Sequence, residues 1–401
     1  MDGSIIITIC TLMLLAYIFE VTSSKTKIPS IILLLVLGWL VKQITVILHI
    51  DIPNLELALP FLGNIGLILI VLEGSLELEL KKENYPIIAK SAIMALFPMI
   101  VLSCGIAYAF YYFDPDLSFK SALGNAIPLG VISSAVAISS VKNLNPMNKE
   151  MITYESSMSD VLGVIFFNFV TLNQTIVPAT YGYFVLDLLL ILLISLVATI
   201  SLAFLLSKIK HHVKFAPIII LLIMIYFITK VYHLPALVFV LLFGLLIGNL
   251  DELKHMKFVQ KLHPEILTKE VQKFKELNIE FTFLTRTLFF ILFGYLIKTS
   301  EVLNTKTIVW AIGITAFIFL LRAIILKIVG LPLKPLFFIA PRGLITILLF
   351  LSIPVTLRSQ YLNNSLIIQV ILLTVLVMMV GLMFNKKEKN GEDEIIDQNQ
   401  E

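Results

Sequence analysis

The chain has 401 residues, of which 58% are hydrophobic and only 14% are charged. This balance excludes a soluble domain, which would not need so much apolar surface, and it predicts an integral membrane protein. The apolar composition leads us to expect a lipid bilayer around the protein. The formal net charge of +3 indicates no particular partner, and no bound nucleic acid is expected. The two cysteines, Cys10 and Cys104, lie in apolar segments and predict neither a disulfide framework nor a metal site.

Apolar runs of about 18 residues or more predict membrane-spanning helices. About thirteen such segments follow one another, at 4–22, 29–48, 57–78, 86–113, 119–141, 150–173, 182–206, 215–231, 234–250, 281–298, 307–328, 334–356 and 364–384. They predict a single all-α transmembrane domain over residues 1–384. Two polar segments remain: 251–280, rich in Lys and Glu, predicts a loop with a surface helix, and 385–401 predicts a short disordered tail.

Lysine residues are concentrated in every second loop, starting with Lys25 and Lys27 after the first segment and ending with Lys386 and Lys387 in the tail. Loops rich in Lys and Arg stay in the cytoplasm when a membrane protein inserts. We therefore expect the loop 251–280 and the C-terminus in the cytoplasm and the N-terminus outside the cell membrane. This orientation requires an odd number of spans.

Two carboxylates, Glu155 and Asp160, lie inside the apolar segment 150–173. A charged side chain at the centre of a membrane helix costs about 2.5–3.5 kcal/mol on insertion scales, and such residues mark ion or proton pathways. On a helix these two side chains point about 140° apart, so they suit different tasks. One can face a cavity and bind an ion, while the other can pair with a cationic side chain of a neighbouring helix.

Oxygen atoms are the ligands that a hard cation such as Na⁺ or Li⁺ prefers. Asp160 and Ser156 share one face of the helix at i,i+4 spacing, and Ser133 in the preceding segment offers a further hydroxyl and freed backbone carbonyls. These residues predict a cation site in which Asp160 and Ser156 are the central ligands. Alternatively, Ser133, Ser134 and Ser156 could be small residues that only allow helices to approach closely.

Two segments are interrupted by Pro, Gly and polar residues at membrane depth, one at 128–135 and the other at 339–343. Such backbone is tolerated there only where it is buried in protein or lines a cavity. The two segments are seven apart and cross the membrane in opposite directions, and matched interrupted helices in inverted halves indicate a transporter's substrate site. We therefore predict two inverted repeats, with the ion site in a core formed by 119–173 and 307–356.

The motif at 155–160, Glu-Ser-Ser-Met-Ser-Asp, resembles the Glu-Ser-x-x-Asn-Asp motif of NhaP/NHE-type sodium/proton exchangers, a branch of the monovalent cation:proton antiporters. The motifs at 321–323, Leu-Arg-Ala, and 341–343, Pro-Arg-Gly, are similar to the arginine helix and the crossing segment of that branch. The motif at 286–290, Arg-Thr-Leu-Phe-Phe, is similar to its Arg-x-x-Phe-Phe helix. The resemblance covers roughly residues 5–385.

This resemblance implies an NhaA/NhaP-like fold with discontinuous crossing helices, and a homodimer. It also implies an ion pair between Glu155 and Arg322. Pro341, Arg342 and Gly343 are expected to support the crossing. Arg342 could do so by bonding freed backbone carbonyls without touching the transported ion.

Two positions depart from the family pattern. Ser159 stands where the motif has Asn, and the fifth segment has Ser134 near the position where the family has an Asp. In the electrogenic branch of the superfamily the residue before the ion-binding Asp is a second Asp. Since Ser159 carries no charge, we expect Asp160 to be the one carboxylate that titrates and exchange to be electroneutral, one cation for one proton.

The prediction is therefore a secondary transporter in the cell membrane that exchanges Na⁺, or else K⁺ or Li⁺, for H⁺ by competition at Asp160, with Ser133, Ser134, Ser156 and Ser159 around it. No catalytic residue and no cofactor are expected. One alternative is a symporter of another solute on the same inverted plan, which the absent Asp near Ser134 leaves open. Another is an intramembrane enzyme, although paired Asp, Ser–His and His-Glu-x-x-His arrangements are all absent at membrane depth.

Overall fold

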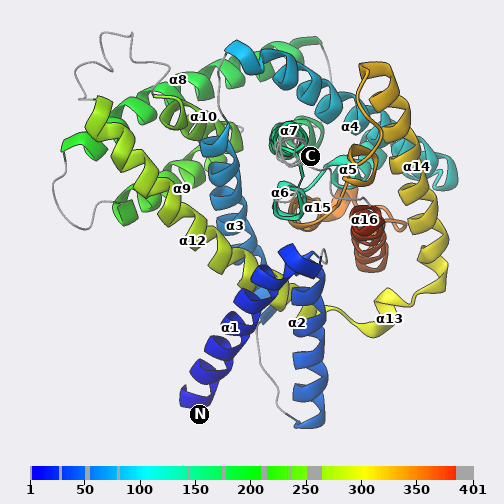
Figure 1. The fold of residues 1–401 in the computed structure, drawn as a ribbon. Coiled ribbons are helices and arrows are strands. Elements are labelled where there is room, and N and C mark those ends of the chain that lie inside the picture. Colours follow the sequence, from blue (N-terminus) through cyan, green and yellow to red (C-terminus); the bar gives the residue numbers. More distant parts are fainter. Residues whose placement is uncertain are drawn as a thin grey trace, which may run out of the picture.

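The computed structural model describes residues 2–26, 29–49, 55–78, 82–141, 144–173, 178–208, 215–232, 234, 236–250 and 264–384. Within these ranges every regular element is a helix, and the helices follow the predicted apolar segments in order (Figure 1). The helices are α1 (Asp2–Thr26), α2 (Ser30–Ile47), α3 (Leu55–Glu77), α4 (Tyr85–Phe113), α5 (Phe119–Gly130), α6 (Ser134–Ser140), α7 (Pro146–Leu172), α8 (Pro178–Lys208), α9 (Phe215–Val231), α10 (Ala236–Gly248), α12 (Pro264–Leu296), α13 (Thr299–Val302), α14 (Thr305–Val329), α15 (Leu344–Leu351) and α16 (Asn364–Phe384). Short 3₁₀ turns occur at η1 (Lys82–Asn84), η3 (Leu336–Phe338) and η4 (Val355–Leu357).

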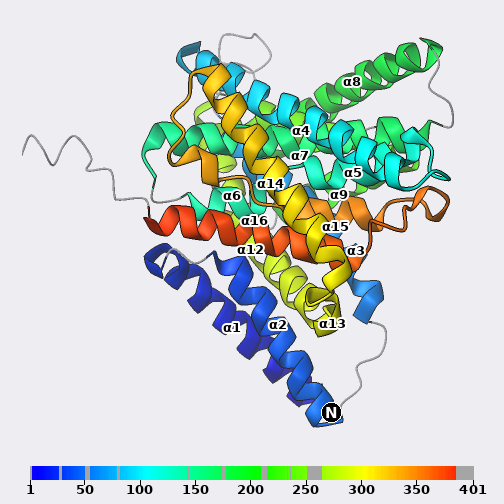
Figure 2. The same cartoon turned by 90° about the vertical axis from the view of Figure 1, so that its right-hand side faces the viewer.

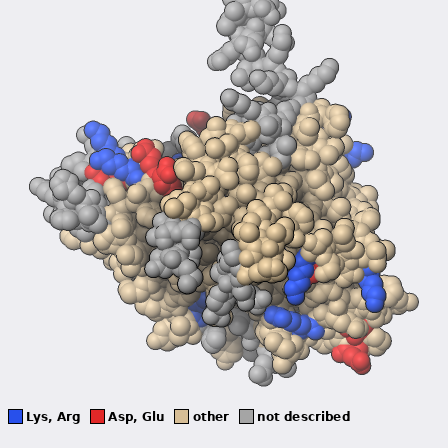
Figure 3. All heavy atoms as spheres, turned by 90° about the horizontal axis from the view of Figure 1, so that it is seen from below, with Lys and Arg blue, Asp and Glu red and all other residues tan. Residues whose placement is uncertain are grey.

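The helices have the length and polarity of membrane spans. Among the described residues, eight helical segments are long and apolar enough to cross a bilayer, and three shorter apolar helical stretches accompany them. Figure 3 shows one face on which most of the surface is uncharged, with small groups of charged side chains at its upper left and lower right. The protein is therefore a multi-pass membrane protein, and the count of thirteen spans stays a prediction.

Two predicted spans are broken helices, at the positions where the sequence is interrupted. The segment 119–141 consists of α5 and α6 with extended residues 131–133 between them. The segment 334–356 consists of η3, the extended residues 339–343 and α15. Pro and Gly in both segments prevent a continuous ladder of helix hydrogen bonds.

The start of the predicted span 281–298 is corrected by the structure, because α12 begins at Pro264. The second part of the predicted loop 251–280 is therefore the first half of a continuous helix of 33 residues. No Gly or Pro interrupts 265–293, and its Lys and Glu residues are good helix formers, so nothing local ends the helix at the polar boundary. Residues 251–263 and the predicted tail 385–401 lie outside the described residues.

The helices form two packed groups that meet along α3 (Figures 1 and 2). In one group α12 packs against α2 and α3, and α10 packs against α3 and α8. In the other, α4 packs against α5 and α7, and α14 packs against α4 and α16. The short helix α15 contacts α3 of the first group and α5 and α7 of the second, so it lies where the two groups meet.

Glycines bring α2 and α12 into backbone contact in the first group. A methyl group on Gly38 of α2 would lie only 2.8 Å from the backbone nitrogen of Tyr295, and one on Gly294 of α12 only 2.9 Å from Cα of Leu35. Since lipid tails are as apolar as the helices, close packing of small residues is a main source of helix association in a bilayer.

We expect Gly38→Ala and Gly294→Ala each to destabilise the protein by about 1–3 kcal/mol, because the added methyl group has no room. Thermal unfolding of the purified protein in detergent measures the change. Gly313→Ala on α14 is the matched control, since no atom outside the helix lies within 4 Å of the added group. Equal melting temperatures for Gly38→Ala and Gly313→Ala would contradict this account of the contact.

Candidate ion-binding site

The two broken helices cross and bind each other through their backbones. The N–H of Ser133, in the break between α5 and α6, donates to the carbonyl of Pro341 at 2.9 Å. A side chain on Gly343 would lie 2.8 Å from Oγ of Ser133 and 2.7 Å from a methyl carbon of Val136, so a larger residue there would displace one of these side chains. The predicted support residues Pro341 and Gly343 thus lie directly at the crossing, where backbone freed from helices is bonded within the protein.

Arg342 binds the carbonyl groups that the crossing leaves free. Its side chain is buried, and its guanidinium donates to the carbonyls of Leu129 at 2.7 Å, Ala340 at 2.9 Å and Gly130 at 3.4 Å. Its backbone N–H donates to Oγ1 of Thr374 on α16 at 3.1 Å. The C-terminal end of α5 carries partial negative charge, so a buried cation is stabilised there. The guanidinium therefore bonds carbonyls of the crossing, and the support role of Arg342 stays a prediction.

Asp160 lies on α7 beside the crossing, with 2% of its surface exposed. Its Oδ2 accepts hydrogen bonds from the backbone N–H of Ser134, at 3.3 Å, and from the Ser134 hydroxyl. Its Oδ1 is buried and has no hydrogen-bond partner among the described residues. One carboxylate oxygen is therefore held by the start of α6, while the other forms no hydrogen bond with the described residues.

The other predicted serines surround this carboxylate in different ways. Oγ of Ser159 accepts a hydrogen bond from the backbone N–H of Ile132 at 2.9 Å, so it fixes the extended break. Oγ of Ser156 donates to the carbonyl of Ile152 at 2.7 Å, which leaves its lone pairs available. The structure therefore brings Ser133, Ser134 and Ser159 to the crossing and keeps Ser156 one turn before Asp160 on α7.

Glu155 and Arg322 form a buried, two-pronged ion pair. Nη1 and Nη2 of Arg322 lie 2.5 Å and 3.1 Å from the two oxygens of Glu155, and both side chains are almost fully buried. Nε of Arg322 donates to the carbonyl of Leu336 in η3 at 2.7 Å. Paired N–H···O bonds of this kind are strong and fix geometry. The pair ties α7 to α14 and η3.

Thr374 is a site-supporting residue that the sequence did not reveal. It lies on the last described helix and holds the backbone of Arg342. A single threonine in an apolar helix carries no signal that would separate it from the many threonines that bond their own helix. Only the packing of α16 against the crossing shows its position.

A group of membrane-length helices in which two broken helices cross beside a buried carboxylate is the architecture of a secondary transporter. The family model described as "Sodium/hydrogen exchanger, transmembrane" matches residues 10–386. The chain therefore belongs to the sodium/hydrogen exchanger family.

The chain is also similar to proteins of Methanocaldococcus jannaschii. It is 31% identical to "Probable Na(+)/H(+) antiporter 2" over 148 residues, which cover 36% of this chain and about a third (34%) of the length of that relative. A solved structure of the sodium proton antiporter MjNhaP1 at pH 8 matches with a TM-score of 0.65 and 17% identity, over 96% of each chain. An electron-microscopy structure of the same antiporter matches with a TM-score of 0.65 over 97% of this chain and 99% of the other. The expected all-α antiporter fold is confirmed.

We expect Glu155→Gln and Arg322→Met each to destabilise the protein by about 3–5 kcal/mol, because each leaves an uncompensated buried group. The double variant should be more stable than the sum of the two single losses predicts. Unfolding in detergent of the unaltered protein, the two single variants and the double variant measures this difference.

The control is Arg286→Met, which removes the ion pair between α12 and Glu20 of α1. That pair is longer, at 3.7 Å, and both side chains are more exposed, so its loss should cost only about 0–1 kcal/mol. Additive losses at Glu155 and Arg322 would show that the two side chains do not stabilise each other.

Proposed function

We propose that this protein exchanges a monovalent cation for H⁺ across the cell membrane, with both ions competing for Asp160. Na⁺ is the first candidate cation, and Li⁺ and K⁺ are the others. The observation that carries the proposal is the buried, unpartnered Oδ1 of Asp160 beside the crossing, in a chain of the sodium/hydrogen exchanger family. A carboxylate oxygen in this position can hold a proton or a cation, but not both.

Oxygen ligands surround the proposed site. Asp160 supplies a carboxylate oxygen, and Ser156 supplies lone pairs one turn away on the same helix. Three further serines support these ligands. Ser133 and Ser159 hold the break, and Ser134 fixes the second oxygen of Asp160. Glu155 is excluded from the ligand set because Arg322 occupies both of its oxygens.

The contacts of Ser134 support an exchange of one cation for one proton. Ser134 stands near the position where the family pattern has an Asp, and its hydroxyl and N–H both donate to Asp160. Ser159, the residue before Asp160, likewise carries no charge. One titrating carboxylate at the crossing would then carry one positive charge in each direction, and the exchange would be electroneutral.

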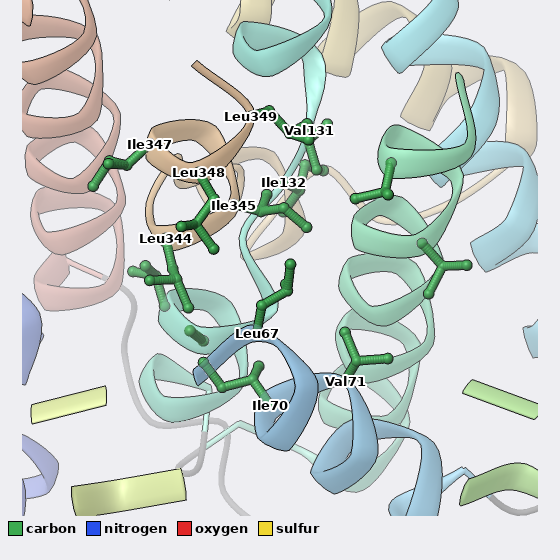
Figure 4. Packing of buried hydrophobic residues seen from close by; sticks show 14 of the residues in the cluster. Leu67, Ile70, Val71, Val131, Ile132, Leu344, Ile345, Ile347, Leu348 and Leu349 are labelled. Carbon is green, nitrogen blue, oxygen red and sulfur yellow. The ribbon is translucent and has the colours of Figure 1, made fainter. Parts of the chain in front are cut away.

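Apolar packing next to the crossing supports alternating access. Leu67 of α3 lies next to Ile132 of the break, with Ile70 and Val71 further along α3 (Figure 4). From α15 come the labelled side chains of Leu344, Ile345, Leu348 and Leu349 (Figure 4). Gly163 lies about one turn after Asp160 on α7, and a side chain there would meet the methyl groups of Val131. This apolar layer therefore lies toward the C-terminal end of α7 from Asp160.

A cavity of about 290 Å³ lies further along α3 in the same direction. Leu59 and Pro60 line it together with Phe293 of α12 and with Lys298 and Glu301 near α13. We propose that the apolar layer closes the path between this cavity and Asp160, and that movement of the two helix groups opens it in turn. Because of the proposed inverted repeats, the core helices would have the same arrangement whether this path is open or closed.

The orientation and assembly remain part of the proposal. The lysine-rich alternate loops support a cytoplasmic C-terminus and an outer N-terminus. The family resemblance supports a homodimer.

We expect Asp160→Asn to abolish exchange, because the amide can neither release a proton nor bind a cation by charge. In everted vesicles, dequenching of a ΔpH-sensitive dye after addition of Na⁺, Li⁺ or K⁺ measures exchange. Arg286→Met, which changes an ion pair outside the crossing, should keep the response. If no cation produced a response from the unaltered protein, or if Asp160→Asn behaved like it, the proposed function would be wrong.

We expect the rate of Na⁺/H⁺ exchange in proteoliposomes to be independent of membrane potential. Each cycle moves one positive charge in and one out, so a potential does no net work on it. Potentials of either sign, imposed with K⁺ and valinomycin, test this, provided that K⁺ alone gives no exchange. A rate that rises with one sign of the potential and falls with the other would contradict the stoichiometry.

A further inference from the structure

We infer that Ser157 is a further oxygen ligand of the transported cation, on the side of Asp160 that faces α3. This inference rests on the proposed cation exchange at Asp160 and names a residue of that site which the motif at 155–160 does not single out.

The first observation is that the Ser157 hydroxyl is buried without a partner. The residue has 5% of its surface exposed, and its Oγ makes no hydrogen bond among the described residues. Its two serine neighbours on α7 differ from it, because Ser156 bonds the carbonyl of Ile152 and Ser159 binds the N–H of Ile132. A helix serine can always bond the carbonyl of the preceding turn, so a buried serine that does not needs another explanation.

Helix geometry gives the position of Ser157 around α7 relative to Asp160. At about 100° per residue, Ser157 lies about 60° around α7 from Asp160, and Ser159 lies about 100° around in the opposite sense. Ser159 binds the N–H of Ile132 in the break, and Ser134 at the start of α6 donates to Asp160, so the crossing lies on that side of the carboxylate. Ser157 therefore flanks the other side, one turn away, where residues at i,i+3 spacing are neighbours.

The second observation is that α3 leaves room for this hydroxyl at one glycine. A Cβ atom on Gly74 would lie 2.7 Å from Oγ of Ser157. Any larger residue at position 74 would push the hydroxyl away from its present position. The absence of a side chain on Gly74 therefore gives the Ser157 hydroxyl its place between α3 and α7.

These observations place two unpartnered, buried oxygen atoms, Oδ1 of Asp160 and Oγ of Ser157, on adjoining positions of α7. A desolvated Na⁺ or Li⁺ would satisfy both at once, because a hard cation accepts a carboxylate and a neutral hydroxyl together. A proton on Asp160 needs only one of them. Ser157 would then strengthen cation binding more than proton binding and would affect which cation is preferred.

Ser157→Ala tests the inference in proteoliposomes, with the rate measured against Na⁺, Li⁺ and K⁺ concentration at fixed pH. We expect the cation concentration for half-maximal rate to rise about tenfold, as for loss of a bond to a charged group, with the maximal rate within about twofold. Gly74→Ala, which keeps the hydroxyl but displaces it, should raise the same concentration. The control Ser195→Ala removes a buried hydroxyl of α8 that bonds the carbonyl of Ile191 at 2.6 Å, and it should change neither quantity.

The outcomes separate this inference from the proposed function. Exchange by the unaltered protein, its loss in Asp160→Asn and an unchanged half-maximal concentration in Ser157→Ala would overturn the role of Ser157 alone. No exchange by the unaltered protein would overturn both. If Ser157→Ala does not fold, Na⁺-dependent thermal stabilisation of purified Gly74→Ala decides: stabilisation at unchanged Na⁺ concentration would overturn the inference, and a requirement for more Na⁺ would support it.

Discussion

The central constraint on this structure is that backbone groups freed from helices at membrane depth must be bonded within the protein, because lipid offers them no partner. Arg342 meets this constraint for the C-terminal end of α5 by donating to the carbonyls of Leu129 and Gly130. The bond from Ser133 to Pro341 meets it for the two extended breaks. The crossing can exist only because these bonds replace the missing helix ladder, and the position of Asp160 depends on the crossing.

The charged groups of the core divide into satisfied and unsatisfied ones. Glu155 and Arg322 satisfy each other, and Arg342 is satisfied by carbonyl groups. Asp160 alone among these has an oxygen without a partner in the described part of the chain. A buried group that stays unsatisfied is costly and needs an explanation. In the function we propose, this oxygen binds an ion for part of a cycle and releases it in another part.

Some features of the site were predictable because they follow from local rules. The positions of both breaks followed from Pro and Gly at 128–135 and 339–343, and the separate directions of Glu155 and Asp160 followed from helix geometry. The start of α12 was not predictable from polarity, because a helix continues from water into a membrane when no residue interrupts it. The contact of Thr374 with Arg342 was not predictable either, since it depends on how α16 packs against the crossing.

The sequence alone determined that this is an α-helical membrane protein with carboxylates at membrane depth and two interrupted helices. The helical membrane fold follows from the length of the apolar segments, and the buried carboxylates follow from charge within an apolar run. The interrupted helices follow from residues that cannot continue a helix. The tertiary structure decided which oxygen of Asp160 is hydrogen-bonded and which has no partner among the described residues, and that Arg342 binds carbonyls. It also decided that the Ser157 hydroxyl packs against Gly74. These depend on the distance between helices far apart in the chain, and the packing of their small residues, not their periodicity, sets that distance.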